Sequence, residues 1–316
     1  MKNKALYKYI NLLLRITIGI AAVYFIYLKL KDNFLIGLQQ VKTESVNLLL
    51  IVLVLLIMIL NWGIEAIKWR YSIKKTKEIT VFKAFKLTIT GITLSILTPN
   101  RIGEIPFRAF LLSRDEFKEL TLKTIVGSYS QVLITLMMGV IGLLLNINNY
   151  SLYIDSFILV PIVLIPPLIL IMIYFKVNRL EKILNKIRFF KEKKIFTALS
   201  EFSMSELFKI LLMSFMRYTI FSLQYYLILR AFGVMLNSFN DMMLICVCFM
   251  FTSFIPTILL SEIGIRGSIA LFVFGVISTL HVQIVIASVL LWVINVAIPA
   301  IFGLFNLNQI KIYKTV

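Results

Sequence analysis

The sequence predicts an all-α, polytopic helical membrane protein, and three observations support this prediction. Apolar residues make up 60% of the chain, whereas soluble domains use about 45–50%. The mean hydropathy is +0.94. Apolar runs recur along the chain, and some, such as 46–60 and 157–175, approach the roughly 20 residues that span a hydrocarbon core. Because many runs follow the first, we interpret the first as a span and not as a cleaved signal peptide.

We expect six spanning helices from these apolar runs. They cover approximately residues 9–30, 46–70, 124–145, 157–175, 208–230 and 283–304. The second of them ends in the sequence NWGIEAIKWR, where Trp62 and Trp69 fit the aromatic belt at a membrane interface. In the same stretch Glu65 lies three residues before Lys68, so we interpret these two residues as a simple interfacial ion pair.

The positive charge of the chain also fits a membrane location. The formal net charge is +18, which by itself would suit a nucleic-acid partner. In so apolar a chain, basic loops that face anionic lipid head groups account for this charge, and we expect no nucleic-acid partner. Basic residues concentrate in 68–86 and 176–209. We therefore place both segments and both termini on the cytoplasmic side of the cytoplasmic membrane, with 176–207 as an amphipathic linker on the lipid surface.

The apolar run 87–98 is too short to span a bilayer comfortably. If it crossed the membrane, the basic residues that follow it would lie outside, against the charge rule. We therefore predict that 84–112 forms a re-entrant helical hairpin that enters from the cytoplasm and returns. The structural residues and charges of its turn are Pro99, Arg101, Gly103, Glu104 and Arg108.

A second stretch, 253–268, has the same ingredients in the sequence SFIPTILLSEIGIRGS. We expect the segment 242–260 to enter from the external face and to break near its proline, and the segment 265–280 to return. The structural residues and charges of this turn are Pro256, Glu262, Gly264, Arg266 and Gly267. The second hairpin therefore faces the first.

Two hairpins that enter from opposite faces, each flanked by spanning helices, are typical of an inverted repeat. The expected halves are 46–145 and 208–306, within one integral membrane domain that covers 1–316. Irregular backbone at membrane depth is tolerated only where protein or water surrounds it. The two turns should therefore meet and form one polar site.

The charged turns are the candidate site because a charge at the bilayer centre costs about 2.5–3.5 kcal/mol on insertion scales. Such side chains must face each other or water, and arginine binds phosphate through a planar fork. If each glutamate pairs with an arginine of the other turn, one guanidinium stays free for an anion, and half-helix N-termini after Gly103 and Gly264 would add N–H donors. The candidate substrate-binding residues are Arg101, Glu104, Arg108, Arg217, Gln224, Tyr225, Glu262 and Arg266.

Simpler interpretations of several of these residues stay open. Arg101 and Arg108 could be ordinary charges of a cytoplasmic loop. Arg217 lies near a helix end, where it could snorkel to the head groups. Gln224 and Tyr225 lie in the middle of a predicted span and could form hydrogen bonds between helices.

The sequence indicates no cofactor and no metal site. Cys246 and Cys248 lie in an apolar run, separated by one residue, so they face different sides of a helix and fit a role as small core residues. His281 is the only histidine, and a single imidazole cannot build a histidine-rich metal site.

The first turn, TPNRIGEIPFRAFLL at 98–112, resembles the TP-x-R-x-GE turn of the lysylphosphatidylglycerol synthase transmembrane-region family of flippase-like membrane proteins. The second, P-x(5)-E-x-G-x-R-G at 256–267, resembles the other Pro/Gly/Glu/Arg turn of that family, although TILLS replaces the frequent Pro/Gly-rich run. The resemblance covers about 10–306. It implies similarity to the membrane half of synthases that make and flip aminoacylated phosphatidylglycerol, and to domains fused to glycosyltransferases that act on polyprenyl phosphates.

The resemblance and the charged turns together predict a flippase or transporter for an anionic or polyprenyl-phosphate lipid. Only a few residues follow the last expected helix, so we expect no soluble aminoacyl-transfer domain and do not carry over lipid aminoacylation. We expect no enzymatic activity. Two alternatives stay open: a membrane-embedded enzyme with Glu104 or Glu262 as a general base towards lipid phosphate, and an accessory subunit that acts beside envelope-biosynthesis enzymes in lipid or glycan assembly.

Overall fold

A computed structural model describes residues 46–96, 98–147, 156–179, 197–257 and 259–307, together with residues 17, 20, 24 and 26–28. Most of the predicted span 9–30 and of the predicted linker 176–207 therefore lies outside the described residues. Within the described ranges all regular structure is helical and no strand occurs, which confirms the all-α prediction.

Apart from α12, the described helices follow the expected segments closely. Their bounds are α3 (Leu48–Ile73), α4 (Val81–Ser95), the 3-10 turn η1 (Pro99–Arg101), α5 (Glu104–Leu112), α6 (Phe117–Leu145), α7 (Ser156–Phe175), α9 (Thr197–Ser200), α10 (Met204–Ala231), α11 (Phe239–Phe254), α12 (Leu259–Phe274), α13 (His281–Trp292), the π-helical turn η4 (Val293–Ala297) and α14 (Ile298–Leu307).

Three helices of the described part are long and apolar enough to cross a membrane: α3, α6 and the continuous run from α13 to α14. Shorter apolar helices lie within α7 and at α11. Many large apolar side chains are exposed on the outer surface, for example Leu49 at 76% and Ile162 at 61%. Exposed apolar surface of this kind is the surface that a bilayer covers. The chain is therefore a polytopic membrane protein, and the number of six spans stays a prediction.

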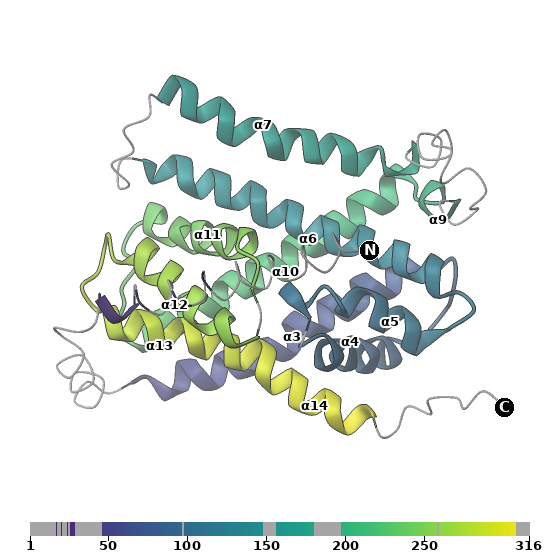
Figure 1. Ribbon diagram of the computed structural model, residues 1–316, viewed down its shortest axis with the longest axis horizontal. Helices are drawn as coiled ribbons and strands as arrows, with labels where there is room; N and C mark the ends of the chain where they lie inside the picture. Colours follow the sequence, from purple (N-terminus) through teal and green to yellow (C-terminus); the bar gives the residue numbers. More distant parts are fainter. Residues whose placement is uncertain are drawn as a thin grey trace, which may run out of the picture.

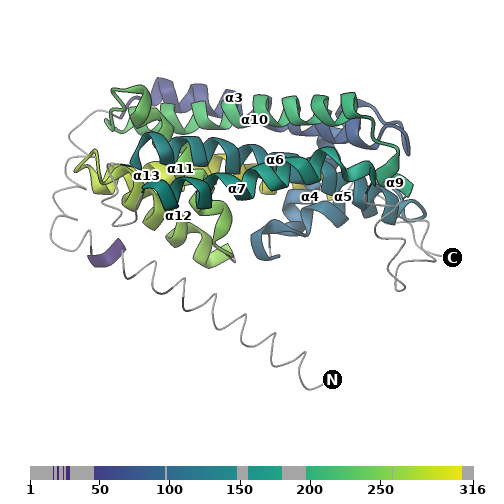
Figure 2. The same cartoon turned by 90° about the horizontal axis from the view of Figure 1, so that it is seen from above.

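The long helices run side by side, and two short hairpins enter between them from opposite ends (Figures 1 and 2). One hairpin is α4–α5, whose outer end lies at the same end of the molecule as α9. The other is α11–α12, whose outer end lies beside the start of α13. In both views the tips of the hairpins point towards the middle of the molecule.

The first helix of each hairpin packs closely against a long helix from the other half of the chain. Helix α4 contacts α14, and α11 contacts α6. Glycines allow both approaches, because a Cβ on Gly303 would lie 2.7 Å from the carbonyl oxygen of Ile89, and a Cβ on Gly139 would lie 2.8 Å from Cγ of Met250. Small residues at such contacts are the usual device for close helix packing in membranes.

An ion-pair cluster holds together the end of the molecule from which α4–α5 enters. Lys123 is 1% exposed and contacts the carboxylates of Glu119 at 2.9 Å and Glu201 at 2.7 Å. Nearby, the Nζ of Lys75 lies 2.7 Å from Glu206. Burial raises the pKa of Glu206, but hydrogen bonds from Lys75 and from the backbone at Ser203 outweigh it and lower that pKa to about 2.

Candidate functional site

The tip of the first hairpin has an unusual backbone conformation. Asn100 and Arg101 both have positive φ angles, 47° and 55°. Asparagine tolerates this left-handed region, whereas arginine adopts it only when its surroundings enforce it. Both predicted structural residues lie in this break: Pro99 begins η1, and the amide of Gly103 donates a 3.0 Å hydrogen bond to Oγ1 of Thr98. A Cβ on Gly103 would lie 2.7 Å from Cγ2 of Thr98, so the turn needs glycine there.

The tip of the second hairpin is a shorter break than we predicted. Helix α11 ends at Phe254, and Ile255 before the proline is extended, with φ −85° and ψ 119°. Pro256 lies in this break as predicted, since proline restricts the residue before it and lacks an N–H donor. Helix α12 begins at Leu259 and not at 265.

The prediction that Gly264 and Gly267 belong to this turn is therefore wrong, because both lie inside α12. The expected half-helix N-terminus after Gly264 is at Leu259 instead. A Cβ on Gly267 would lie 3.1 Å from Cδ1 of Ile26, which is a tight contact, and 3.4 Å from Cγ1 of Val285 on α13, which is an ordinary one.

The two tips contact each other directly. The amide of Asn100 donates to the carbonyl of Thr257 at 3.0 Å. The side-chain Oδ1 of Asn100 accepts from the hydroxyl of Thr257 at 3.1 Å and from its amide. Nη2 of Arg101 lies 3.3 Å from Oε1 of Glu262. Residues far apart in the sequence therefore join the ends of two hairpins that enter from opposite sides.

A cavity of about 480 Å³ lies where the tips meet. It is lined by both tips and by α3, α6, α10, α13 and η4. The charged residues along its wall are Glu65, Lys68, Arg101, Glu104, Arg108, Arg217, Glu262 and Arg266. These five cationic groups and three carboxylates leave a formal excess of two positive charges. Six of the eight predicted binding residues belong to this set.

Glu65 of α3 is the centre of the first charge group in this cavity. Its carboxylate contacts Lys68 at 2.8 Å, Arg108 at 3.0 Å and Arg217 at 3.1 Å. Arg108 also pairs with Glu104 on its own helix. Glu65 is 6% exposed and Lys68 is 1% exposed. The pair that we interpreted as interfacial is therefore buried and belongs to the site.

The interfacial assignment of Trp62 and Trp69 is also wrong. The two rings are 4% and 2% exposed. Cζ of Arg217 lies 4.9 Å from the centre of the Trp62 ring, which fits a cation–π contact. Nε1 of Trp69 donates to Oγ1 of Thr124 at 2.9 Å. Both tryptophans support the charge network from within the protein.

Glu262 is the centre of the second charge group. Its Oε1 accepts from Nε of Arg266 at 3.0 Å and lies 2.9 Å from Nη2 of the same arginine, and it also contacts Arg101. The side chains of Arg101 and Arg266 are 23% and 17% exposed, whereas the side chain of Arg108 is 3% exposed. The guanidinium groups of the second charge group are therefore more accessible than that of Arg108, and the side chain of Arg217 is similarly exposed at 19%.

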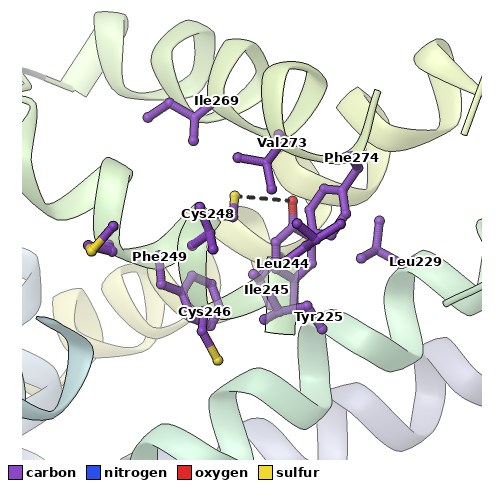
Figure 3. Close-up of a cluster of buried hydrophobic side chains, with 14 of the residues drawn as sticks. Tyr225, Leu229, Leu244, Ile245, Cys246, Cys248, Phe249, Ile269, Val273 and Phe274 are labelled. Atoms are coloured by element: carbon purple, nitrogen blue, oxygen red, sulfur yellow. Dashed lines mark hydrogen bonds between the residues drawn. The ribbon is translucent and has the colours of Figure 1, made fainter. Parts of the chain in front are cut away.

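Gln224 and Tyr225 lie outside the cavity, so the structure does not bring them to the site. Nε2 of Gln224 donates to the carbonyl of Val54 at 3.1 Å, which is a bond between helices. Tyr225 is 1% exposed in an apolar core (Figure 3). Its hydroxyl accepts from the thiol of Cys248 at 3.9 Å. Cys246 and Cys248 are both buried free cysteines in this core, as small core residues would be.

A buried amide pair completes the polar part of the wall. Nδ2 of Asn61 donates to Oδ1 of Asn295 at 2.9 Å and approaches Oε1 of Gln224 at 3.5 Å. Asn61, Glu65 and Lys68 are spaced four and three residues apart, so they form one polar stripe on a mostly apolar helix. This stripe is the signal by which the sequence could have revealed them.

The charged side chains of the site are mainly cationic. Within the described ranges no three side chains of histidine, cysteine, aspartate or glutamate come together as a metal site. The cationic excess and the planar guanidinium groups suit a phosphate or another anionic group.

Comparison with known proteins gives one match. The sequence model of the family described as "Lysylphosphatidylglycerol synthase TM region" matches residues 12–303. No curated protein and no solved structure matches the chain.

Proposed function

We propose a lipid-translocating function, starting from the fact that this chain belongs to the lysylphosphatidylglycerol synthase transmembrane-region family. The family connects this membrane protein with lipid modification or transport. Our specific proposal is a flippase or transporter that moves an anionic or polyprenyl-phosphate lipid across the cytoplasmic membrane. Both termini lie on the cytoplasmic side in this proposal.

The observation that carries the proposal is the cationic cavity between the two hairpin tips. Its five cationic side chains and three carboxylates come from both tips and from α3 and α10. Burial of a charge without compensation is costly, so an excess of positive charge inside a membrane protein favours an anionic ligand. The head group would occupy the cavity while the lipid chains stay against the apolar exterior.

We also propose that 46–145 and 208–306 form an inverted repeat. The contact of α4 with α14 has its counterpart in the contact of α11 with α6. The contact of α5 with α6 has its counterpart in the contact of α12 with α13. An inverted repeat around a central site is the arrangement by which many transporters expose one site alternately to the two sides.

The test is lipid translocation by the purified chain in vesicles of phosphatidylcholine that contain fluorescent phosphatidylglycerol. Bleaching by a membrane-impermeant reductant reports movement between leaflets. We expect Glu104→Ala and Arg266→Ala to lower the rate to that of protein-free vesicles. Arg230→Ala is a matched control, because Arg230 is exposed and lies outside the cavity, and it should retain the rate.

Correct insertion of each variant is checked by gel filtration in detergent. Normal lipid movement by both cavity variants would reject the proposal. The same preparations, incubated with a polyprenyl phosphate and analysed by mass spectrometry, address the alternative of an enzyme. Product formation without lipid movement would favour an embedded enzyme over a flippase. If both activities are absent until another envelope protein is added, the chain would be an accessory subunit.

A further inference from the structure

The charges of the cavity divide into two groups with different compositions. The first is centred on Glu65, and there three cationic side chains share two carboxylates, those of Glu65 and Glu104. In the second, the guanidinium groups of Arg101 and Arg266 share Oε1 of Glu262. Each group therefore carries one excess positive charge, but only the second consists of two arginines on one carboxylate oxygen.

The guanidinium groups of the second group have more N–H donors than they use towards Glu262. A guanidinium has five N–H donors. Arg266 uses Nε and Nη2 towards Glu262, and Arg101 approaches the same carboxylate through Nη2 at 3.3 Å. In the described part of the chain, Glu262 is the only acceptor found for the side chain of Arg101. Since both side chains line the cavity and are partly exposed, their remaining donors can reach a ligand.

Within the first group, Arg108 and Lys68 are buried, whereas the side chain of Arg217 is 19% exposed and pairs with Glu65 at 3.1 Å. Arg108 has two carboxylate partners, from Glu104 and Glu65, and its side chain is 3% exposed. Lys68 contacts Glu65 and also approaches Oε1 of Gln131 at 3.4 Å. A ligand would have to break buried ion pairs to bind there. Arg108 and Lys68 therefore hold the helices together, whereas Arg101 and Arg266 are partly exposed and share a single carboxylate oxygen.

We infer that Arg101 and Arg266 form the subsite for one phosphate group of the transported lipid, and that this phosphate competes with Glu262 for Arg101. This inference rests on the proposed function and specifies its site. The single excess charge of the second group matches a phosphodiester, which carries one negative charge, better than a phosphomonoester with up to two.

Competition for Arg101 also links binding to the contact between the hairpins. Arg101 belongs to the first hairpin and Glu262 to the second, so the pair is one of the ties between the tips. When the phosphate takes Arg101, this tie opens, and the hydrogen bonds between Asn100 and Thr257 remain. Loading of the site thus loosens the tips without separating them.

The test is equilibrium binding to the full chain in detergent, with probes that share the same short acyl chains. The probes are phosphatidylglycerol, phosphatidic acid and diacylglycerol, together with inorganic phosphate. We expect phosphatidylglycerol to bind best and diacylglycerol not to bind measurably. Inorganic phosphate should bind at least about tenfold more weakly. Equal binding of inorganic phosphate would mean that the subsite serves a free anion, and it would overturn the lipid assignment.

The variants test the two parts of the inference separately. Arg101→Ala and Arg266→Ala should each weaken phosphatidylglycerol binding about tenfold, since each removes a charge-assisted hydrogen bond. Glu262→Gln should strengthen binding about fivefold, because a competing carboxylate is gone. Arg230→Ala is the control and should bind as the unmodified chain does. Weaker binding by Glu262→Gln would overturn the competition.

Conservative variants keep the test valid if an alanine variant does not fold. Arg101→Lys and Arg266→Lys retain the charge but lose the fork, and each should still weaken binding about threefold. Unchanged binding by both lysine variants and by every folded alanine variant would overturn the subsite, even if the chain moves lipid. Conversely, binding that follows the expected pattern without any lipid movement would leave the subsite intact and reject the proposed function.

Discussion

The two hairpins carry the same ion pair but use it differently. In α5, Arg108 pairs with Glu104 four residues before it, and in α12, Arg266 pairs with Glu262 at the same spacing. In the first hairpin the arginine gains a second carboxylate, Glu65 of α3. In the second hairpin the glutamate gains a second arginine from the opposite tip. We propose that the extra carboxylate fixes Arg108 in place, whereas the extra guanidinium at Glu262 leaves a site for an anion.

The comparison teaches that the neighbours of a motif decide its role. Both hairpins place a glutamate in the first turn of the returning helix. Only the first lies beside the polar stripe of α3, which brings Glu65 within 3.0 Å of Arg108. We therefore assign a structural role to the pair of the first hairpin and a ligand-binding role to that of the second.

Removal of Glu65 should have the largest effect on stability. Glu65→Gln takes away the carboxylate that three buried cations share. Breaking a buried ion pair in this way costs about 3–5 kcal/mol of unfolding free energy. Titration with sodium dodecyl sulfate in mixed micelles measures this loss. Glu104→Gln is the matched control and should lose less, since Arg108 retains Glu65 and the Glu104 side chain is 22% exposed. Equal losses for the two variants would contradict the central place of Glu65.

Removal of the arginine should destabilise the first hairpin more than the second. Arg108→Ala should lower the unfolding free energy by about 2–3 kcal/mol, because it leaves buried carboxylates with fewer partners. Arg266→Ala should lower it by about 1 kcal/mol, because its side chain is 17% exposed and water can solvate Glu262. The same titration, applied to both variants side by side, measures which loss of unfolding free energy is larger. A larger loss for Arg266→Ala would reverse the assignment of roles.

The smallest expected effect concerns the backbone of the first tip. Asn100→Ala loses the side-chain bond to Thr257 and places alanine at a φ of 47°. Asn100→Gly loses the same bond but adopts this backbone freely. The alanine variant should therefore be less stable than the glycine variant by about 1 kcal/mol. Equal unfolding free energies would show that the left-handed turn is not retained in the variants.

The sequence was sufficient to predict the helical membrane fold and the two hairpins. Charged residues next to Pro or Gly inside apolar segments located both tips. Charged side chains are costly inside a membrane and usually mark a functional site there. The sequence did not reveal the start of α12, since Gly264 resembles a helix breaker but lies inside this helix. The break lies at Pro256, between α11 and α12.

The sequence was less informative about which spanning helices contribute to the site. Glu65 lies in a stretch with two tryptophans and a lysine, a composition that also fits a membrane interface. Only the depth of Trp62 and Trp69 in the packed structure distinguishes the two locations. Gln224 shows the opposite case, since a polar residue in the middle of a span bonds to a neighbouring helix and does not reach the cavity.

The most direct test of the central claim is a cross-link between the two tips. The amide nitrogen of Asn100 lies 3.0 Å from the carbonyl oxygen of Thr257, so cysteines at these positions are within reach of a disulfide. Both changes are made in a chain whose Cys246 and Cys248 are alanine, and mild oxidation in intact membranes is followed by peptide mass spectrometry.

We predict that Asn100→Cys with Thr257→Cys forms the disulfide in most molecules. Asn100→Cys with Ser278→Cys, which lies after α12 at the outer end of the second hairpin, should stay reduced. If the tip pair stays reduced as well, the two hairpins do not meet, and the cavity between them is not the site.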